Sequence, residues 1–401
     1  MAEGPNPSGM SEDDFLLLNP GPVPLTDRVR RAMDRPMVSH RSADFEAVYE
    51  RAQEGLDYVF TRSTIDETRT SEAGTSLLLN GTATMAMEAA VANLVDPDDE
   101  VVALVNGKFG RRFARIADRH ARCRRVEADW GDSFDLDAVE AAVSDDTAVV
   151  TLVHNETSTG LLNPVAAVGE IADAHDAAFV VDGVTSIGGD EFRIDDWGVD
   201  VAITDAQKAI AAPPGISAVY VTDRIEGALD GDGAPFYEDL DWHLRKAADN
   251  QTPFTSAVPL VRALAEAVDQ IVEEGLPHRI RRHRRQARAF GDGFTAMGLE
   301  RFPTLSGPTD LSNTVTAIDL PEDVAADPDP FFDAVAARDV SISGGQAHLA
   351  GQIFRVSNMG NLTDEQVLRG VETVGEALRD VGVRVDVDAG CNTARDVLNK
   401  D

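Results

Sequence analysis

The chain has 401 residues, 43 % of them hydrophobic, which predicts two or three folding units with a substantial core. Its formal net charge is −34 and acidic residues recur along the whole chain, which excludes nucleic acids and anionic membranes as expected partners. No apolar run approaches the length of a membrane span and no signal peptide is visible, so we expect no membrane partner.

The acidity and the scarcity of lysine bear on the environment of the protein. Only four of the 36 basic residues are lysines. Such a surface is typical of proteins from extreme halophiles, in which salt screens the self-repulsion; an acidic mesophilic protein is the less favoured alternative. Cys123 and Cys391 lie far apart in the sequence and suggest no disulfide framework, so we expect a reducing, cytoplasmic environment.

The first predicted elements are an extension, an arm and two helices. Residues 1–14 are rich in Gly, Pro, Ser and acidic residues, which predicts disorder. Residues 16–24 form an extended arm that is broken by prolines. Helices are predicted over 26–33, with Thr26 as the N-cap, and over 44–60.

From residue 76 the chain alternates between short β-branched runs and helical stretches. Strands are predicted at 76–79, 100–105, 148–153, 178–181, 199–203 and 217–221, and helices at 85–94, 110–120 and 164–175. This order predicts an α/β fold with a mostly parallel sheet and helices on both faces. Ligands of such sheets bind beyond the carboxyl ends of the strands.

After Pro259 the pattern changes to long helices with few strands, which predicts a small α+β domain. Helices are predicted at 260–274, 279–297, 330–338 and 364–379, and strands at 312–318, 340–343 and 353–357. The predicted organisation is a disordered extension (1–14), a large domain with the arm (15–280), a small C-terminal domain (281–385) and a loosely ordered tail (386–401).

The predicted domain boundary falls inside a basic segment, His278–Arg288, that stands out from the acidic remainder. We favour a helix that bridges the two domains and pairs with acidic residues elsewhere. A polyanion-binding site is the alternative.

Lys208 carries the most chemical information in this chain. It lies in an apolar stretch, and a desolvated lysine can lose its proton and act as a nucleophile, which arginine cannot do. Asp182 ends the apolar run 178–181, so both side chains are expected at the carboxyl ends of strands, on one edge of the sheet. A lysine that forms a Schiff base and an aspartate that keeps the pyridine nitrogen protonated are the pair that pyridoxal 5'-phosphate (PLP) requires. Taken alone, a solvated surface lysine would be the favoured interpretation.

Three segments that follow predicted strands carry candidate cofactor contacts. The turn 80–84 offers backbone N–H groups, hydroxyls and a helix N-terminus to an anion, although an ordinary N-cap is favoured when the turn is taken alone. Phe109 lies between glycines and either stacks on a flat ring or packs in the core. The hydroxyl groups of residues 154–160 have two expected roles. They can donate hydrogen bonds to the phenolic oxygen of the cofactor, and Ser158 or Thr159 can cap a helix; both roles can hold at once.

Two further side chains complete the candidate set. Gln207 precedes Lys208 and is expected to reach the phosphate. Arg355 lies within an apolar strand and can offer a bidentate fork to a carboxylate, whereas a structural ion pair is favoured when Arg355 is taken alone.

Together these segments resemble class-V aminotransferases of PLP fold type I, above all alanine–glyoxylate and serine–pyruvate aminotransferases. The resemblance runs from about residue 16 to about residue 385. It implies a large domain with a mostly parallel seven-stranded sheet and a small C-terminal α+β domain. The stretches that carry it are Asn19–Pro22, Asn106–Gly110, Glu156–Gly160, Val181–Gly189, Gln207–Ala209, Pro213–Gly215 and the segment that ends at Arg355.

The resemblance implies a role for each candidate residue. Lys208 would bind the cofactor covalently and move the α-proton, and Asp182 would hold the pyridine nitrogen. Gly21 and Arg355 would contact the substrate, Arg355 through the α-carboxylate. The remaining cofactor contacts would come from Thr82, Ala83, Thr84, Phe109, Thr157, Val184 and Gln207, and from Thr255 of a neighbouring subunit, which implies a homodimer with shared active sites.

The implied activity is a ping-pong transamination from alanine or serine to glyoxylate or pyruvate. Phosphoserine, aspartate and ureidoglycine stay open as donors. The segment that contains His40 and Arg41 resembles one with which phosphoserine aminotransferases hold the substrate phosphate, and ordering of the N-terminal arm is its alternative role. A lyase such as a cysteine desulfurase needs a reactive cysteine late in the chain, which neither cysteine supplies, and no metal site is expected.

Overall fold

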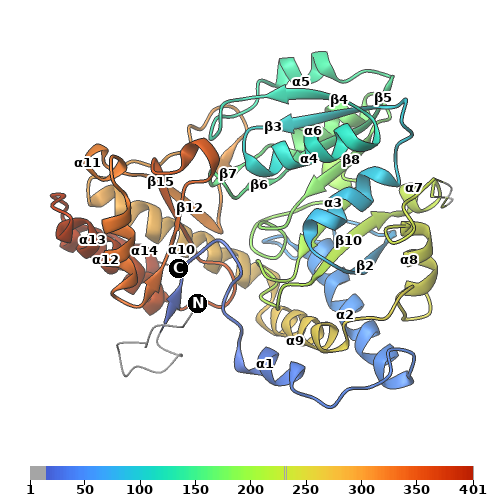
Figure 1. The fold of residues 1–401 in the computed structure, drawn as a ribbon, viewed down its shortest axis with the longest axis horizontal. Helices are drawn as coiled ribbons and strands as arrows, with labels where there is room; N and C mark the ends of the chain where they lie inside the picture. The colour runs from blue at the N-terminus through green and yellow to red at the C-terminus, as the bar shows by residue number, and fades with distance from the viewer. Residues whose placement is uncertain (1–14, 230, 232, 401) are drawn as a thin grey trace, which may run out of the picture.

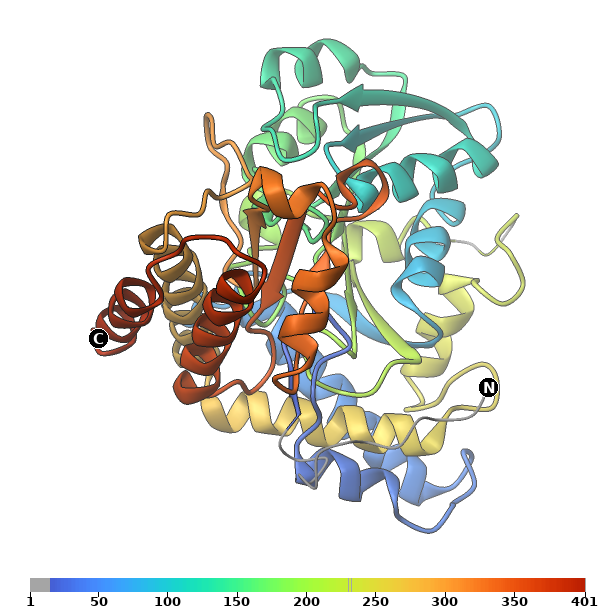
Figure 2. The ribbon, with the colours of Figure 1, turned by 60° about the vertical axis from the view of Figure 1, so that its left-hand side comes forward.

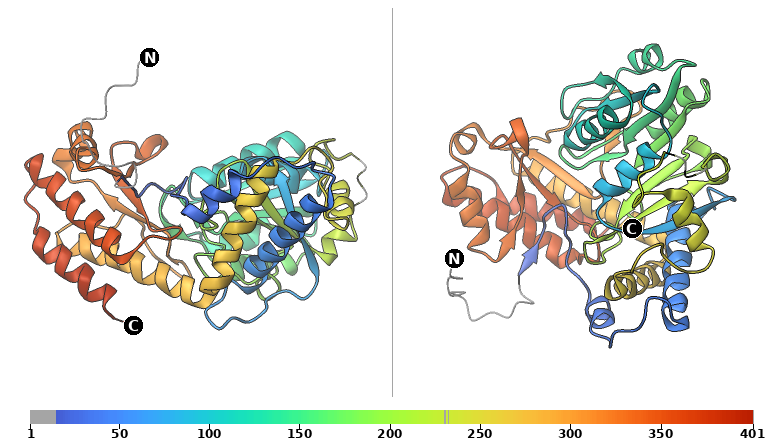
Figure 3. Two further views of the ribbon diagram at one scale, coloured as in Figure 1. Left: turned by 90° about the horizontal axis from the view of Figure 1, so that it is seen from below. Right: turned by 45° about the vertical axis from the view of Figure 1, so that its right-hand side comes forward.

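The structure, a computed structural model, describes residues 15–229, 231 and 233–400. Two parts lie side by side, and the long helix α10 (Leu276–Ala296) runs between them (Figure 1, Figure 3). The first part holds a seven-stranded sheet, and the second holds a three-stranded sheet with the C-terminal helices. The predicted extension 1–14 lies outside the described residues.

The seven-stranded sheet confirms the predicted α/β fold. In spatial order its strands are β2 (Gly74–Asn80), β10 (Ile216–Thr222), β9 (Val201–Asp205), β8 (Ala178–Asp182), β5 (Thr147–Val153), β3 (Glu100–Val105) and β4 (Arg122–Glu127). β10 runs antiparallel to both of its neighbours, and the other six strands all run in one direction. The carboxyl ends of these six strands therefore meet at one edge of the sheet, where the candidate side chains are expected.

Strand β4 is the one strand of this sheet that the β-branched pattern does not predict. It consists mainly of charged residues, and most of its side chains are exposed. It pairs only with β3, and charged side chains on such an edge strand discourage pairing with further chains. Because β4 lies at the edge of the sheet, its side chains can be charged, and its sequence therefore lacks the apolar run that predicts the other strands.

Helices pack along the sheet and close a continuous apolar core. α1 (Asp27–Met33) and α2 (Ala43–Arg62) pack against α9 (Val258–Glu274). The predicted N-cap is confirmed, because Val29 N donates to Thr26 Oγ1 at 3.3 Å. The other helices of this part are α3 (Ala83–Ala92), α4 (Lys108–His120), α5 (Leu136–Ala142), α6 (Val165–Asp173), η2 (Asp195–Trp197), α7 (Asp223–Glu226) and α8 (Leu240–Ala247).

The second part has its own core around an antiparallel sheet of β12 (Val315–Asp319), β15 (Ile353–Ser357) and β14 (Ser343–Gly344). Its helices are α11 (Glu322–Ala325), α12 (Asp329–Ala336), η3 (Ala347–Leu349) and α13 (Asp364–Asp380). A short sheet of β6 (Asn155–Glu156), β7 (Leu161–Leu162) and β11 (Asp310–Leu311) links the two parts. The predicted boundary near residue 280 falls inside α10, and the division into a large and a small domain stays a prediction.

The start of the N-terminal arm packs with the second core rather than with the first. β1 (Leu16–Leu17) pairs in parallel with β13 (Val340–Ser341). Leu16 and Leu18 are buried in the second core, which removes their apolar surface from water. The start of the arm thus contacts the second core, and its predicted assignment to the large domain stays a prediction.

The prediction of a loosely ordered tail over 386–401 is also wrong for the residues that the structure describes. Val387–Leu398 form the helix α14, which packs against α10 and α13 (Figure 2). Asp386 caps it by accepting from Ala389 N at 3.0 Å. Val387, Gly390, Ala394 and Val397 recur at helical spacing and are buried, so the helix is stabilised by an apolar face that the charged residues between them obscure.

The basic segment pairs with acidic residues, as we favoured. Arg279 is 1 % exposed, and both it and Arg282 form ion pairs with Glu274. Arg285 pairs with Asp364 at 3.0 Å. Arg279 also donates through Nη2 to Ala209 O at 2.6 Å, which ties α10 to the loop that carries Lys208.

Candidate active site

Lys208 lies in the loop after β9, against the N-terminal arm. Its Nζ donates to Pro20 O, and Val23 N donates to Gln207 O at 3.1 Å. A Cβ atom added to Gly21 would lie 2.7 Å from Lys208 Nζ, and the φ angle of Gly21 is +86°. Glycine is therefore required at position 21 on two grounds, the backbone conformation and the close approach of the lysine.

Burial lowers the pKa of the Lys208 amine to about 8, and the carboxylates of Asp205 and Asp182 partly offset that effect. The positive charge of Arg355 acts in the same direction as burial. Neutral amine is therefore much more abundant at pH 7 to 8 than for an exposed lysine, which suits a nucleophile.

Asp182 ends strand β8 and is 5 % exposed. Its Oδ1 accepts from Val184 N at 2.9 Å, and among the described residues no donor reaches Oδ2. Burial raises the pKa of Asp182 to about 7. A buried carboxylate with one free oxygen is suited to a positively charged partner, which would lower this pKa again.

Of the three predicted ring contacts, Phe109 lies in the first turn of α4, and Thr157 and Val184 lie on loops. Phe109 N donates to Glu156 Oε2 at 3.0 Å, and Thr157 Oγ1 lies 3.0 Å from Thr185 Oγ1. Glu156, which the sequence interpretation left without a role, also accepts from Gly110 N at 3.1 Å and from Ser158 Oγ at 2.5 Å. This buried carboxylate thereby holds the start of α4 against the loop that carries Thr157.

The predicted phosphate contacts gather at the N-terminus of α3. Thr82 is the N-cap residue, but its side chain makes no capping hydrogen bond. Thr84 Oγ1 accepts from Arg112 Nη1 at 2.7 Å. Ala83 N and Gln207 Nε2 both donate to Asp205 Oδ2, at 2.9 and 2.7 Å. An anionic oxygen therefore already lies where backbone and amide donors converge, so the donors suit an anion.

Arg112 and Asp205 were not predicted as site residues. Arg112 lies on α4, and its guanidinium carbon is 4.8 Å from the centroid of the Phe109 ring. Its only sequence signal is its position one helical turn after Lys108. Asp205 lies three residues before Lys208 in the motif that the sequence analysis emphasises, so proximity to Lys208 was its signal.

Arg355 is 3 % exposed in strand β15. It donates to Thr157 O at 2.8 Å and, through Nε and Nη2, to Gly344 O at 3.2 and 2.8 Å. These bonds leave part of the guanidinium fork free for a carboxylate. Among the described residues Arg355 forms no ion pair, so the structural ion pair that was the alternative explanation is not observed.

Three predicted site residues, His40, Arg41 and Thr255, lie on two segments that Arg41 joins. Arg41 donates to Gln251 Oε1, Thr252 O and Pro253 O at 2.7 to 3.0 Å. Thr255, two residues further on, is exposed. His40 makes no hydrogen bond to another described residue. Arg41 thus orders the segment that carries Thr255. The contact of His40 and Arg41 with a substrate phosphate and that of Thr255 with the cofactor phosphate of a neighbouring subunit stay predictions.

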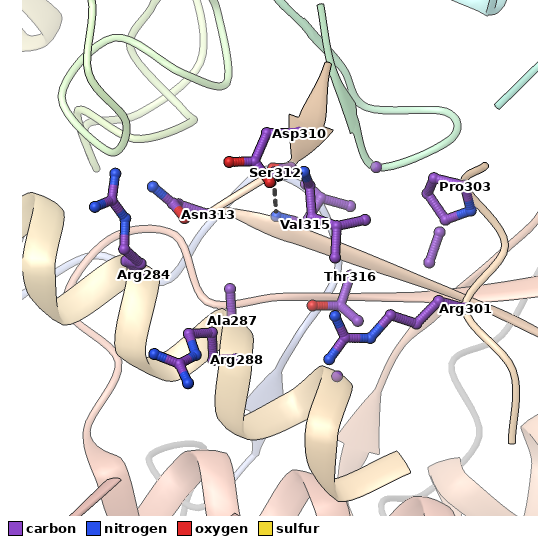
Figure 4. A pocket seen from close by; sticks show the side chains of 14 residues that line it. Arg284, Ala287, Arg288, Arg301, Pro303, Asp310, Ser312, Asn313, Val315 and Thr316 are labelled. Carbon is purple, nitrogen blue, oxygen red and sulfur yellow. Dashed lines mark hydrogen bonds between the residues drawn. The ribbon is translucent and has the colours of Figure 1, made fainter. Parts of the chain in front are cut away.

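A further pocket, with a volume of about 170 Å³, lies between α10 and β12 (Figure 4). Arg284 and Arg288 of the basic segment line it together with Arg301. Neither Lys208 nor Asp182 lines this pocket, so it is distinct from the candidate active site. The polyanion alternative for the basic segment stays a prediction.

The side chains at the sheet edge fit PLP. Asp182 offers a free buried carboxylate oxygen, Lys208 an amine with a lowered pKa, and the N-terminus of α3 a group of donors that already bind a carboxylate. When bound, the cofactor supplies an electron sink for negative charge that develops on a neighbouring carbon. Lys208, Asp182 and the donors near Ala83 would hold it.

Several known proteins are similar to this chain over nearly its whole length. The class-V aminotransferase family matches residues 17–325. The L-aspartate–glyoxylate aminotransferase of Paracoccus denitrificans is 32 % identical, over 94 % of this chain and 94 % of its own. The serine–glyoxylate aminotransferase of Arabidopsis thaliana is 31 % identical, over 95 % and 94 %. The crystal structure of ureidoglycine–glyoxylate aminotransferase from Bacillus subtilis superposes with a TM-score of 0.86 at 28 % identity, covering 98 % of this chain and 100 % of that one.

Proposed function

Because the chain belongs to the class-V aminotransferases and is therefore a PLP-dependent transaminase, we propose that it moves the amino group of alanine or serine to glyoxylate or pyruvate in a ping-pong reaction. The observation that carries this proposal is Lys208. Its amine has a pKa of about 8, touches Gly21, and lies within electrostatic reach of both Asp182 and Arg355. The charges of Asp182 and Arg355 therefore both act on the Lys208 amine, as does that of Asp205.

Each of these side chains has one task in the proposed reaction. The free part of the Arg355 fork binds the α-carboxylate of the substrate and so orients the α-carbon. The Lys208 amine would take the proton from that carbon, which becomes the carbonyl carbon of the 2-oxo acid, and would pass the proton on to the electron sink that the cofactor supplies. Asp182 keeps a proton on the pyridine nitrogen by placing a negative charge beside it. The arm at Gly21 covers the amine and limits its access to water.

The choice of acceptor is supported by the named relatives, and the choice of donor is more open. Glyoxylate is the acceptor in the names of all three proteins compared, whereas the donors are aspartate, serine and ureidoglycine. Serine and alanine share a small side chain, which is our reason for preferring them. Phosphoserine is less favoured, because the Arg41 guanidinium that would bind its phosphate is engaged by the segment 251–253.

The proposed donors and acceptors are tested by absorption spectroscopy of the purified PLP-loaded protein in molar KCl. We expect L-alanine or L-serine to convert the visible band of the bound cofactor to the near-ultraviolet band of its aminated form. Glyoxylate or pyruvate should then restore the visible band. Molar salt is used because a net charge of −34 favours a halophilic protein. A visible band that ignores both donors but responds to aspartate, ureidoglycine or phosphoserine would contradict the proposed substrate pair.

We further propose that the protein is a cytoplasmic homodimer, with the segment around Thr255 facing the partner. Phe236 is 74 % exposed and Tyr237 is 44 % exposed, and both rings pack with Phe254, next to Thr255. Such a group of exposed aromatic rings is typical of an interface. The thiols of Cys123 and Cys391 are free, which is compatible with a reducing compartment.

The homodimer is tested by light scattering after size exclusion in molar KCl. We expect a mass of about twice 43.0 kDa and a shift towards the monomer when Phe236 is replaced with Asp, because a charge cannot be buried in an apolar interface. Leu305→Asp, at another residue that is 45 % exposed, is the matched control and should leave the mass unchanged. A single species of 43.0 kDa at all protein concentrations would contradict the proposal.

A further inference from the structure

Asp205 occupies the donors that the cofactor phosphate would need. It is the last residue of β9 and is 2 % exposed. Its Oδ2 accepts from both Ala83 N and Gln207 Nε2, at 2.9 and 2.7 Å. Its Oδ1 accepts from Ala206 N at 3.1 Å. Two of the predicted phosphate ligands therefore donate to one carboxylate oxygen of the chain itself.

This arrangement satisfies groups that would otherwise be left unpaired. The first N–H groups of a helix have no partner within the helix, and a buried amide without a partner costs free energy. Asp205 supplies that partner for the backbone N–H of Ala83 and for the side-chain amide nitrogen of Gln207. The other side of the Gln207 amide, Oε1, is buried and has no hydrogen-bond partner, so only its donor end is satisfied.

The same arrangement opposes a phosphate. A phosphate monoester carries a charge of about −1.5 to −2 at neutral pH, and like charges placed side by side in a partly buried site repel strongly. Asp205 is buried and fixed by three hydrogen bonds, so its charge is poorly screened by solvent. A phosphate on Ala83 N and Gln207 Nε2 must first displace the carboxylate or share a proton with it.

We propose that the Asp205 carboxylate competes with the cofactor phosphate for the same hydrogen-bond donors. In the cofactor-free chain it accepts hydrogen bonds from these donors, and it thereby weakens the binding of the cofactor. The proposal rests on PLP as the cofactor and is independent of the proposed substrate pair. The chain would consequently bind PLP less tightly, and release it more readily, than a chain with a neutral residue at this position.

The test compares the affinity of the cofactor-free wild type and the Asp205→Asn variant for PLP and for pyridoxal, which lacks the phosphate. Apparent Kd values are measured by absorbance or fluorescence titration at one pH in molar KCl, without any substrate. We expect the variant to bind PLP about tenfold more tightly or better, because removing one of two adjacent like charges is worth at least that much. Its affinity for pyridoxal should rise much less than its affinity for PLP, because for pyridoxal only the effect of Asp205 on the Lys208 amine changes.

One control variant and one alternative variant make the result specific to the donors at the N-terminus of α3. Asp190→Asn changes another buried carboxylate, which binds Asn313 at 2.6 Å instead of the α3 donors, and should leave the PLP affinity unchanged. If Asp205→Asn does not yield folded protein, Asp205→Ser is measured in the same way, since it also removes the charge. An unchanged or weaker affinity of both position-205 variants for PLP, or an equal gain for pyridoxal, would overturn the proposal. Because no substrate enters the titration, this result is separable from a failure of the proposed reaction.

Discussion

Replacing Lys208 with alanine is expected to lower turnover by at least about 10³-fold, because the variant loses both its nucleophile and its proton carrier. The amine has a pKa of about 8 and lies against Gly21, so no other side chain can take its position without moving the arm. The measurement is steady-state transamination together with the visible spectrum of the cofactor-loaded protein. We expect the visible band of the covalently held cofactor to disappear in the variant.

The matched control is Lys246→Ala, which removes a lysine that pairs with Asp249 on the surface. It should turn over like the wild type. Lys108 is a second comparison, because burial also lowers its pKa but it lies at the start of α4. If Lys108→Ala, and not Lys208→Ala, removed the visible band, the assignment of the reactive lysine would be wrong.

The Lys208 amine also predicts a pH dependence for cofactor capture. The pKa of this amine is lowered to about 8, so the neutral form increases as the pH rises through 8. The rate at which cofactor-free protein captures pyridoxal should therefore increase between about pH 7 and pH 9 and level off above that range. Capture that is independent of pH across this range would contradict a role for the neutral amine.

Replacing Asp182 with asparagine is expected to lower kcat by about 10² to 10³-fold while the protein stays folded. Asparagine has nearly the same shape and can still accept from Val184 N, as Asp182 does at 2.9 Å. It cannot carry the negative charge that keeps a proton on the pyridine nitrogen, so the electron sink is weakened. The measurement is kcat from single-turnover kinetics, with the apparent Kd for PLP determined separately.

Asp190→Asn separates this loss of chemistry from a loss of stability. Asp190 is also buried, and burial raises its pKa to about 7, as it does for Asp182. It binds Asn313 through the side-chain amide and the backbone N–H, so its replacement should lower the melting temperature and leave kcat close to that of the wild type. Equal losses of kcat in both variants would show that Asp182 acts only on the fold.

Several features of the site were predictable because they depend on local pattern. Short apolar runs ending in Asp182 and followed by Lys208 indicate parallel strands, and parallel strands end at one edge. Thr26 is an N-cap because its hydroxyl reaches the helix it precedes. The spacing of the apolar residues after Asp386 also indicates the helix α14, although the tail was predicted to be loosely ordered.

Other features depend on contacts between distant segments. Asp205 acquires its partner Ala83 from a helix 122 residues earlier in the chain. Arg41 orders the segment 251–253 across more than 200 residues, and Arg112 reaches Thr84 from the next helix. Nothing in the local sequence of these residues indicates their partners.

Strand period, turn residues and residue chemistry are local properties, so the amino-acid pattern was enough to predict the α/β class, the lysine and aspartate at the sheet edge, and the family motifs. In contrast, the packing of the arm on the second core and against Lys208, and the bonds of Asp205 to the α3 donors, are apparent only in the folded chain. These outcomes follow from how buried apolar surface and unpaired polar groups are satisfied in the folded chain, which requires all segments to be in place together.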